Sequence, residues 1–383
     1  MVDLGTLIHQ AKAVRCGEGN YPVLSMTMHD GLVFQNDKFK KTIASKDKSD
    51  YKVVKRNQLV ISFPIDEGVL ATQRIVDAGI VSPAYGIWDI DQEMILPEFL
   101  EYALRCDRAL NYYKAKLRGS TARRRSLPTS TLLAYTVPLP DISEQEHILN
   151  VVHKTQKVIS GRTEEISLLD NLIKARFVEM FGDSEFNTMQ WPTKKLSELC
   201  YVSSSKRIYQ NEQSTEGVPF LRISDLNERI DNVKNAPELF IPMNKYNELK
   251  ENGLVPAGGD ILVTSRGTLG RCYIVRPEDE FYFQDGMISW LSDFSHQITS
   301  LYLSQLFTMS GIQKQIASLQ AGSTVAYLSI SMLKKLDIML PPLNLQNQFA
   351  VFIEQTDKSK AAVQKALDET QLLFDSLMQK YFG

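Results

Sequence analysis

The chain has 383 residues with a net charge of −2; 43% of the residues are apolar and 23% are charged. These values are ordinary for a soluble globular protein of two or three domains, and they exclude disordered, collagen-like and mini-protein chains. Residues 1–126 contain 19 Lys and Arg against 15 Asp and Glu, and residues 184–327 contain 13 against 16, which excludes a non-specific DNA coat.

Two further classes are excluded by local patterns. No stretch approaches the roughly 18 consecutive apolar residues of a membrane span. Residues 1–4 show neither the basic nor the apolar region of a signal peptide. The four cysteines form no Cys-x-x-Cys pair, so we expect a reduced cytoplasmic protein without a zinc site or a disulfide framework.

The segments 1–126 and 184–327 are predicted to be strand-rich globular units. Alternating apolar residues and turn signals predict strands within 51–61, 218–223, 260–265 and 272–275. A helical stretch follows in each unit, at 97–117 and 299–319, and precedes a Gly-Ser-Thr loop. We interpret each unit as α+β, with a curved or barrel-like sheet and one or two helices. The first unit lacks a clear counterpart to the segment WPTKKLSEL at 191–199.

An internal repeat follows each globular unit. Residues 127–182 align without a gap onto 328–383 at an offset of 201, with 11 identical pairs among 56 positions. Each copy opens with a short apolar piece that ends in proline, a predicted strand, and continues into a long helix. Ser143 with Glu146 forms a capping-box pattern at the start of the first helix, and Asn344 is a plausible N-cap for the second.

Both predicted long helices carry an apolar seam at alternating steps of four and three residues, in the same register in both copies. Each helix runs about 38–40 residues, or roughly 60 Å, and a helix of that length with one apolar stripe needs a partner. The other copy is the obvious one. Gly161 interrupts the first helix and is expected to mark a bend or a close contact. The seam residues are Ile148, Val152, Ile159, Ile166, Leu169 and Ile173 in the first copy and Phe349, Ile353, Val363, Leu367, Phe374 and Leu377 in the second.

Catalytic signatures are almost absent. The chain contains no phosphate-binding G-x-x-x-x-G-K-[ST], no G-x-G-x-x-G and no Asp/Asn-Pro-Pro-aromatic motif of amino-methyltransferases, and its five histidines show no metal-ligand spacing. Glu248-Leu249-Lys250 with Asp231 upstream matches a metal-dependent nuclease pattern, but such triplets are common by chance. Gly267–Gly270 lies between predicted strands and is read as a hairpin rather than a phosphate cradle.

Basic and hydroxyl-rich loops remain as candidate DNA contacts, because guanidinium groups bridge phosphates and read guanine edges. Small hydroxyl residues let backbone amides approach phosphate. Solvated turns are the alternative interpretation. Tyr21 and Tyr209 are weaker candidates for contacts with the DNA backbone. The candidates are Arg118, Ser120, Thr121, Arg123, Arg124 and Arg125 in the first half, and Ser205, Lys206, Arg207, Arg222, Arg266, Thr268, Arg271, Ser323 and Thr324 in the second.

These patterns resemble one known family, the specificity subunits of type I restriction–modification systems. The resemblance rests on the duplicated blocks LPTSTLLAYTVPLPDISEQEHI and LSISMLKKLDIMLPPLNLQNQF, and on VPFLRISDLNERI and GDILVTSRGTLGRCYIV in the second half. It implies target-recognition domains at 1–126 and 184–327, and repeats at 127–183 and 328–383 whose helices pair as an antiparallel coiled coil. In such a subunit each recognition domain reads one half of a split, asymmetric DNA target.

The resemblance also implies partners. The coiled coil would set the distance between half-sites and dock two methyltransferase subunits, and restriction subunits with translocase activity would then join. The chain would be non-catalytic by itself, with no cofactor of its own; S-adenosylmethionine, ATP and magnesium are expected on the partner subunits. A complex with fused modification and cleavage partners, a coiled-coil scaffold without a DNA role and a standalone metal-dependent nuclease remain alternatives. The bases read by each domain and the spacer length stay open.

Overall fold

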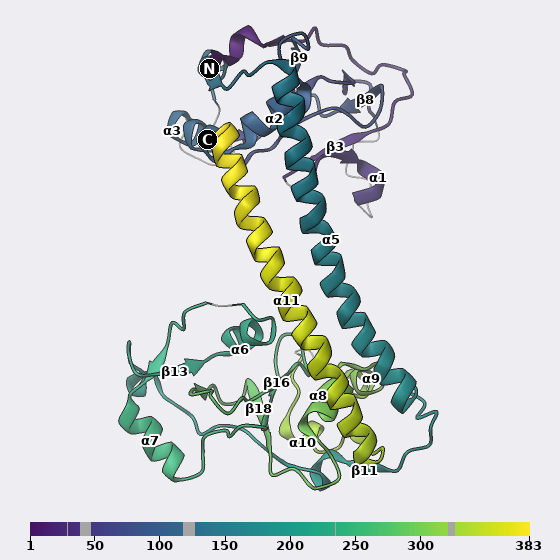
Figure 1. Ribbon diagram of the computed structural model, residues 1–383, viewed down its shortest axis with the longest axis vertical. Coiled ribbons are helices and arrows are strands. Elements are labelled where there is room, and N and C mark those ends of the chain that lie inside the picture. Colours follow the sequence, from purple (N-terminus) through teal and green to yellow (C-terminus); the bar gives the residue numbers. More distant parts are fainter. Residues whose placement is uncertain (29, 39–46, 118–126, 234, 321–325) are drawn as a thin grey trace. The chain divides into compact units, whose positions relative to one another are not determined.

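The computed structural model describes residues 1–28, 30–38, 47–117, 127–233, 235–320 and 326–383. The chain divides into two compact units, and each unit contains part of both long helices (Figure 1). The first unit comprises residues 1–164 and 364–383, and the second comprises residues 165–363. Among the described residues, no helix is both long enough and apolar enough to cross a membrane.

The first unit is built on a four-stranded antiparallel sheet with the order β2-β9-β6-β7. Two antiparallel strand pairs, β3 with β4 and β5 with β8, pack beside this sheet. The elements before the first long helix are β1 (Val2–Asp3), η1 (Leu4–Thr6), β2 (Ile8–Gln10), β3 (Leu24–Thr27), β4 (Gly31–Phe34), α1 (Gln35–Lys38), β5 (Lys52–Lys55), β6 (Leu59–Ile61), η2 (Ile65–Glu67), β7 (Leu70–Thr72), β8 (Ala78–Val81), β9 (Gly86–Ile90), α2 (Pro97–Arg105), α3 (Asp107–Lys116), α4 (Thr129–Leu133) and β10 (Thr136–Val137).

The second unit repeats this plan with a sheet of order β12-β18-β15-β16, to which a three-stranded sheet β14-β13-β17 is added. The predicted α+β class and the predicted strands are therefore confirmed. Its elements before the second long helix are β11 (Thr193–Lys195), η4 (Leu196–Glu198), β12 (Tyr201–Ser203), η5 (Gln210–Glu212), β13 (Val218–Leu221), α6 (Ile223–Ile230), β14 (Phe240–Ile241), α7 (Met243–Glu251), β15 (Ile261–Thr264), β16 (Cys272–Ile274), β17 (Tyr282–Phe283), β18 (Ile288–Ser292), α8 (Ser300–Thr308), α9 (Ser310–Leu319), α10 (Ile330–Leu333) and β19 (Asp337–Met339).

The first unit does have a counterpart to residues 191–199, contrary to the sequence expectation. Strand β1 pairs antiparallel with β10, just as β11 pairs with β19. Leu4 and Leu7 are fully buried after β1, and Leu196 and Leu199 occupy the same places after β11. The expectation failed because only the two buried leucines are shared, whereas the polar residues around them differ.

Each predicted helical stretch before the Gly-Ser-Thr loops consists of two consecutive helices, α2 with α3 and α8 with α9. Cys106 ends α2 and Met309 ends α8 with extended backbone, at ψ 159° and 153°. Both residues are buried. The break lets the chain change direction, so that both helices of each pair bury apolar side chains in the same core.

The two long helices are α5 (Ile142–Phe181) and α11 (Leu343–Phe382), each of 40 residues. Both begin earlier than the capping patterns predicted. The Asp141 carboxylate accepts a hydrogen bond from the Glu144 amide at 2.9 Å, so Asp141 rather than Ser143 caps α5. Asn344 lies inside the first turn of α11 and is not its N-cap.

Within each unit the start of one long helix packs against the end of the other, which makes the pair antiparallel. In the second unit, the ring of Phe349 lies 5.5 Å from Phe177 and 5.3 Å from Phe181. In the first unit, Phe382 joins the core cluster that contains Ile148. Of the predicted seam residues, Ile148, Val152, Ile173, Phe349, Ile353 and Val363 are buried, and the others are half-buried.

A buried glutamine joins the start of each long helix to the loop before the first helix of the same unit. The Gln145 amide accepts from the Leu96 amide at 2.8 Å and donates to the carbonyls of Met94 and Pro140. Gln346, its partner in the repeat, makes the same bonds to Thr299, Gln297 and Pro341. Neither side chain is exposed to solvent, so these three hydrogen bonds take the place of the hydrogen bonds that water would otherwise provide.

Gly161 does not mark a close contact. A Cβ built at this position meets no atom of the described residues within 4 Å, and α5 is helical throughout. Glycine is therefore not required here for packing against the described residues. It lowers the stability of the helix, because glycine loses more backbone entropy on folding than other residues do.

Replacing this glycine should stabilise the chain. We expect Gly161→Ala to raise the free energy of unfolding by up to about 1 kcal/mol, because alanine is the better helix former and the site is open. Urea denaturation followed by circular dichroism measures the change. The repeat supplies a matched control, since Ala362 is the aligned residue of α11 and Ala362→Gly should lower stability by a similar amount. Unchanged stability in both variants would contradict the argument.

Candidate nucleic-acid interface

Three loops of the second unit meet at one edge of its four-stranded sheet. Strand β18 runs antiparallel to both β12 and β15, with Ser203 opposite Trp290 and Thr264 opposite Ile288. The carboxyl ends of β12 and β15 therefore lie beside the amino end of β18. This arrangement brings together residues 204–207, 265–268 and 285–287, which we call the loop edge.

The first of these loops is fixed to its neighbour by side-chain hydrogen bonds. The Ser204 hydroxyl donates to the carbonyl of Ile288 at 2.9 Å, and the Ser205 hydroxyl donates to that of Phe283 at 2.7 Å. The Lys206 amide donates to the Tyr282 hydroxyl at 2.8 Å, which can donate in turn to the Lys206 carbonyl at 3.2 Å. Burial raises the pKa of Tyr282 to about 12, so this hydroxyl keeps its proton at neutral pH.

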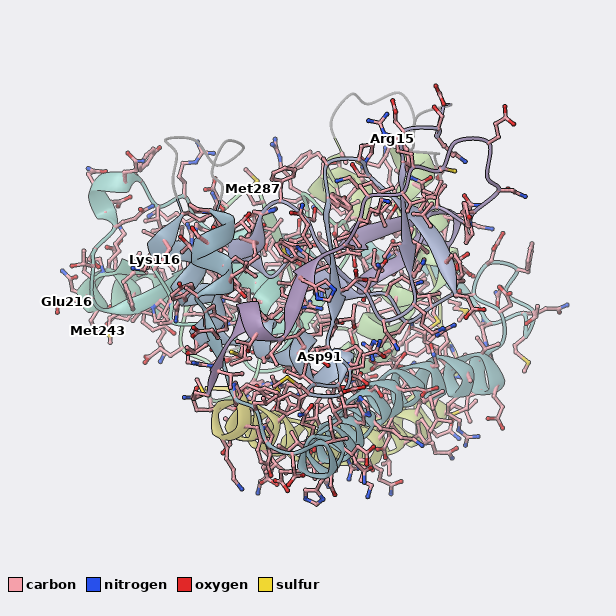
Figure 2. The ribbon with its side chains drawn as sticks, turned by 90° about the horizontal axis from the view of Figure 1, so that it is seen from above. Arg15, Asp91, Lys116, Glu216, Met243 and Met287 are labelled. Carbon is pink, nitrogen blue, oxygen red and sulfur yellow. The ribbon has the colours of Figure 1, made fainter. Side chains whose placement is uncertain are left out.

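The second loop is the six-residue tip of the β15–β16 hairpin, as predicted for Gly267–Gly270. Its first residue, Ser265, is fully buried. The Ser265 amide donates to the carbonyl of Met287, which is labelled in Figure 2, at 2.9 Å, and the Ser265 carbonyl accepts from the Leu328 amide at 2.9 Å. Gly267 and Gly270 have φ values of 69° and 75°, a backbone form that other residues rarely adopt. The backbone of Ser265 is therefore hydrogen-bonded to two other segments of the chain.

Four candidate DNA-contact residues are exposed on the loop edge, namely Lys206, Arg207, Arg266 and Thr268. The Arg207 guanidinium forms an ion pair of 2.9 Å with Asp285. The Arg266 guanidinium lies over the Tyr327 ring, 5.4 Å from its centroid, which leaves the hydrogen-bonding rim of the guanidinium available. Ser205, by contrast, is half-buried, and its hydroxyl is already engaged in the hydrogen bond to the Phe283 carbonyl.

Arg222 and Arg271 are bound by carboxylates instead. Arg222 contacts Glu238 at 2.7 Å and Asp225 at 3.3 Å, and these hydrogen bonds raise the pKa of its guanidinium. Arg271 forms an ion pair with Asp231 and donates to Asn227 at 2.8 Å. Both arginines are only half-exposed, so they do not belong to the exposed basic residues of the loop edge.

The nuclease-like triplet is not assembled into a metal site. Asp231 is occupied by Arg271, and Glu248 lies 3.4 Å from Lys245 on its own helix, α7. Within the part of the chain that the structure describes, no group of three His, Cys, Asp or Glu residues is placed to hold a metal ion.

The remaining candidates include residues that the structure does not describe. The predicted contacts Arg118, Ser120, Thr121, Arg123, Arg124, Arg125, Ser323 and Thr324 lie outside the described residues. Tyr209 and Tyr21 are exposed, by 61% and 38%. Sequence reasoning missed Phe63, which is 60% exposed on the β6–β7 hairpin of the first unit, because that loop carries no basic residue.

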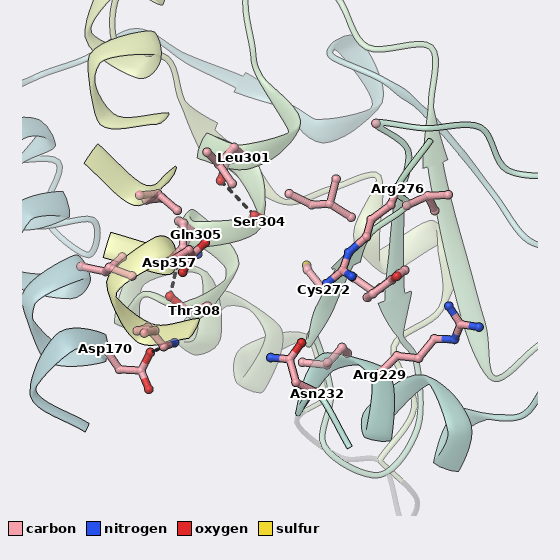
Figure 3. Close-up of a pocket in the computed structure, with 18 of the residues that line it drawn as sticks. Asp170, Arg229, Asn232, Cys272, Arg276, Leu301, Ser304, Gln305, Thr308 and Asp357 are labelled. Atoms are coloured by element: carbon pink, nitrogen blue, oxygen red, sulfur yellow. Dashed lines mark hydrogen bonds and ion pairs between the residues drawn. The ribbon is translucent and has the colours of Figure 1, made fainter. Parts of the chain in front are cut away.

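A cavity of about 720 Å³ lies elsewhere in the second unit, between the long helices, α8 and the β16 strand (Figure 3). Asp170, Asp357 and Gln305 are among its lining residues. In the first unit, Gln156 aligns with Asp357 and accepts a hydrogen bond from the Tyr102 hydroxyl at 3.0 Å. Tyr102 occupies the place in α2 that Gln305 occupies in α8, so the two units differ at this position.

Comparison with known proteins identifies relatives. Residues 189–370 match the family model of the type I restriction modification DNA specificity domain. A protein of Haemophilus influenzae named as a type I restriction enzyme specificity subunit is 25% identical over 251 residues, 64% of this chain and 61% of the relative. The specificity subunit of the type I restriction enzyme MjaVIII of Methanocaldococcus jannaschii is 23% identical over 258 residues, 60% of this chain and 59% of the relative. The matches span about three fifths of these relatives.

Two solved structures share the fold over the whole chain. One belongs to a study of complex assembly and conformational transition of the type I restriction–modification system, with a TM-score of 0.62 and 16% identity, covering 100% of this chain and 96% of that one. The other is the specificity subunit of a type I system from M. genitalium, with a TM-score of 0.55 and 15% identity, covering 100% and 95%.

The fold defines a duplicated protein in which two equivalent mixed α/β units each contain part of two long helices. Residues 189–370 match the type I restriction modification DNA specificity domain, and over about three fifths of its length the chain is similar to proteins named as specificity subunits of type I restriction enzymes. The resemblance found in the sequence is confirmed.

Proposed function

We propose that this chain is the DNA-recognition subunit of a type I restriction–modification complex and that each unit reads one half of a two-part target. The duplication carries the proposal. Both units have a four-stranded sheet of the same order, and each has a hairpin at the equivalent edge of that sheet. Two readers with the same scaffold and different loop residues suit a target with two different halves.

The chemistry of the loop edge supports DNA contact in the second unit. Lys206, Arg207 and Arg266 place exposed donors on loops whose backbones are hydrogen-bonded, as phosphate and base contacts require. Because this unit carries more acidic than basic residues, its attraction for DNA is local rather than general. We therefore propose that tight binding requires the partner subunits.

In this proposal the partners perform the reaction. The methyltransferase subunits hold S-adenosylmethionine, and the restriction subunits hold ATP and magnesium, whereas this chain selects the site without catalysis of its own. Methylation of chromosomal DNA places the complex in the cytoplasm. A complex with fused modification and cleavage partners would use the same chain in the same way and differs only in those partners.

The long helices are proposed to set the gap between half-sites and to dock the methyltransferase subunits. A coiled coil resists bending, whereas a flexible linker would allow many gaps. Both helices also expose leucines that do not belong to the seam. Leu172 is 48% exposed on α5 and Leu373, its identical partner in the repeat, is 54% exposed on α11. Each unit thus offers one equivalent apolar site, which suits two copies of one partner.

The first prediction concerns the target. In cells that express this chain together with its proposed methyltransferase partner, methylome sequencing should reveal a new motif in two parts with a fixed gap. A culture with the methyltransferase alone is the control. No new methylation, with the methyltransferase shown to be folded and bound, would favour a scaffold without a DNA role.

The second prediction concerns the gap. Deleting seven residues within Thr155–Leu169, with a matching deletion in α11, keeps the seam in register and shortens the pair by about 10 Å. The methylated motif should then have a gap shorter by about three base pairs. Replacing seven exposed residues without a change of length serves as the control. Continued methylation with the original gap would refute the spacer role.

The third prediction concerns docking. Leu172→Ala combined with Leu373→Ala should weaken methyltransferase binding at least about tenfold, and either change alone should affect one of two equivalent sites. Titration of the purified chain with the methyltransferase, followed by analytical ultracentrifugation, gives affinity and stoichiometry. Met243→Ala removes a similarly exposed apolar side chain from α7 and should have no effect. Equal binding by all variants would place the docking surface elsewhere.

A further inference from the structure

The β6–β7 hairpin of the first unit and the β15–β16 hairpin of the second are equivalent. In each, a residue at the end of the first strand donates its amide to a backbone carbonyl across the hairpin, from Ser62 to Val69 at 3.1 Å and from Thr264 to Arg271 at 2.9 Å. Six residues lie between these pairs in both units. The last of the six is a glycine with positive φ, Gly68 at 76° in the first unit and one at 75° in the second.

The two tips are both hydrogen-bonded to their surroundings but differ chemically. In the first unit, the buried side chain of Ile65 anchors the tip, and the Ser62 hydroxyl donates to the Phe63 carbonyl at 3.1 Å. This anchoring leaves Phe63 60% exposed, which is unusual for a large aromatic side chain in a loop of fixed conformation. In the second unit, the equivalent tip presents the guanidinium of Arg266, stacked on Tyr327.

We propose that these two hairpin tips read bases, with Arg266 donating two hydrogen bonds to a guanine and Phe63 contacting the methyl group of a thymine. This inference rests on the proposed function and assigns to it one base in each half-site. Arginine is the side chain that pairs with the two acceptors of guanine in the major groove, and an apolar side chain distinguishes thymine by its methyl group.

The stacking on Tyr327 gives Arg266 its discriminating geometry. An arginine that contacts phosphate can sample many positions, because every phosphate is alike. A guanidinium whose face is covered by a ring, on a backbone hydrogen-bonded through Ser265, keeps the plane of its donors in one orientation. That plane is what two-point recognition of guanine requires.

The test for Arg266 uses the full chain with its methyltransferase and methylome sequencing of each variant. Arg266→Lys keeps the positive charge and removes the two-donor geometry. One guanine in one half of the motif should become degenerate, with discrimination reduced about tenfold to a hundredfold, while the other half and the gap stay unchanged. Arg276→Lys, an exposed arginine of the same unit away from the loop edge, is the matched control and should leave the motif intact.

The test for Phe63 uses the purified complex and target duplexes in which each thymine is replaced in turn by deoxyuridine, which lacks only the methyl group. The unaltered complex should bind one of these duplexes about fourfold more weakly. Phe63→Ala should bind that duplex and the thymine duplex equally. Phe63→Leu, which keeps an apolar side chain, should retain part of the preference, and both variants are checked for unchanged thermal unfolding.

The outcomes separate this inference from the proposed function. If the unaltered complex methylates no two-part motif, the recognition function itself fails and the hairpin assignment falls with it. If the motif exists but Arg266→Lys weakens methylation at all sites equally, Arg266 contacts phosphate, and the assignment to guanine is wrong. If Phe63→Ala keeps the thymine preference, or no deoxyuridine affects binding, the assignment of Phe63 is wrong.

Discussion

The buried glutamine at the start of each long helix is the contact on which the arrangement of each unit depends. Gln145 and Gln346 each make three hydrogen bonds to backbone groups that no water can reach. Leaving a buried polar group unpaired costs about 1–3 kcal/mol, so a shift of the helix relative to the loop before α2 or α8 would be penalised several times over. An apolar side chain could fill the same space but could not fix this direction, because apolar contacts are not directional.

Once the helix starts are fixed, the apolar seam aligns the helix pair within each unit. In the second unit, the cluster of Phe177, Phe181 and Phe349 joins α5 and α11 to the core beneath the sheet. In the first unit, Phe382 joins the end of α11 to the core, with its ring centroid 4.9 Å from that of Phe99. The same scaffold therefore arises twice from one repeated sequence pattern, although only 11 of 56 aligned positions are identical.

The loops at the sheet edge are free to differ because the scaffold does not depend on them. The hairpins keep their length and their final glycine, which the turn geometry requires, while the exposed side chain is Phe63 at the first position of one tip and Arg266 at the second position of the other. This separation of a shared frame from tips that differ between the two units suits the proposed reading of a two-part target. It also explains why Arg222 and Arg271, held by carboxylates on or near α6, are better suited to supporting the frame than to reading bases.

Much of the fold was determined by local sequence. The heptad spacing, the strand alternation and the glycine-marked hairpin at Gly267–Gly270 are short-range patterns, so both long helices and several strands, among them β6, β15 and β16, were predicted. Helix starts were misplaced by about two residues, because Ser143 and Asn344 resemble caps although Asp141 makes the hydrogen bond in α5.

Only the tertiary structure decided which loops share an edge. Strand β1 was missed because its partner lies far along the chain, at Val137, and a two-residue strand has no pattern of its own. The meeting of residues 204–207 with the β15–β16 hairpin depends on antiparallel pairing through β18, which local sequence does not encode. Phe63 was overlooked because its loop carries no basic residue. A single phenylalanine normally indicates core, and its exposure follows only from the rigid hairpin that holds it outward.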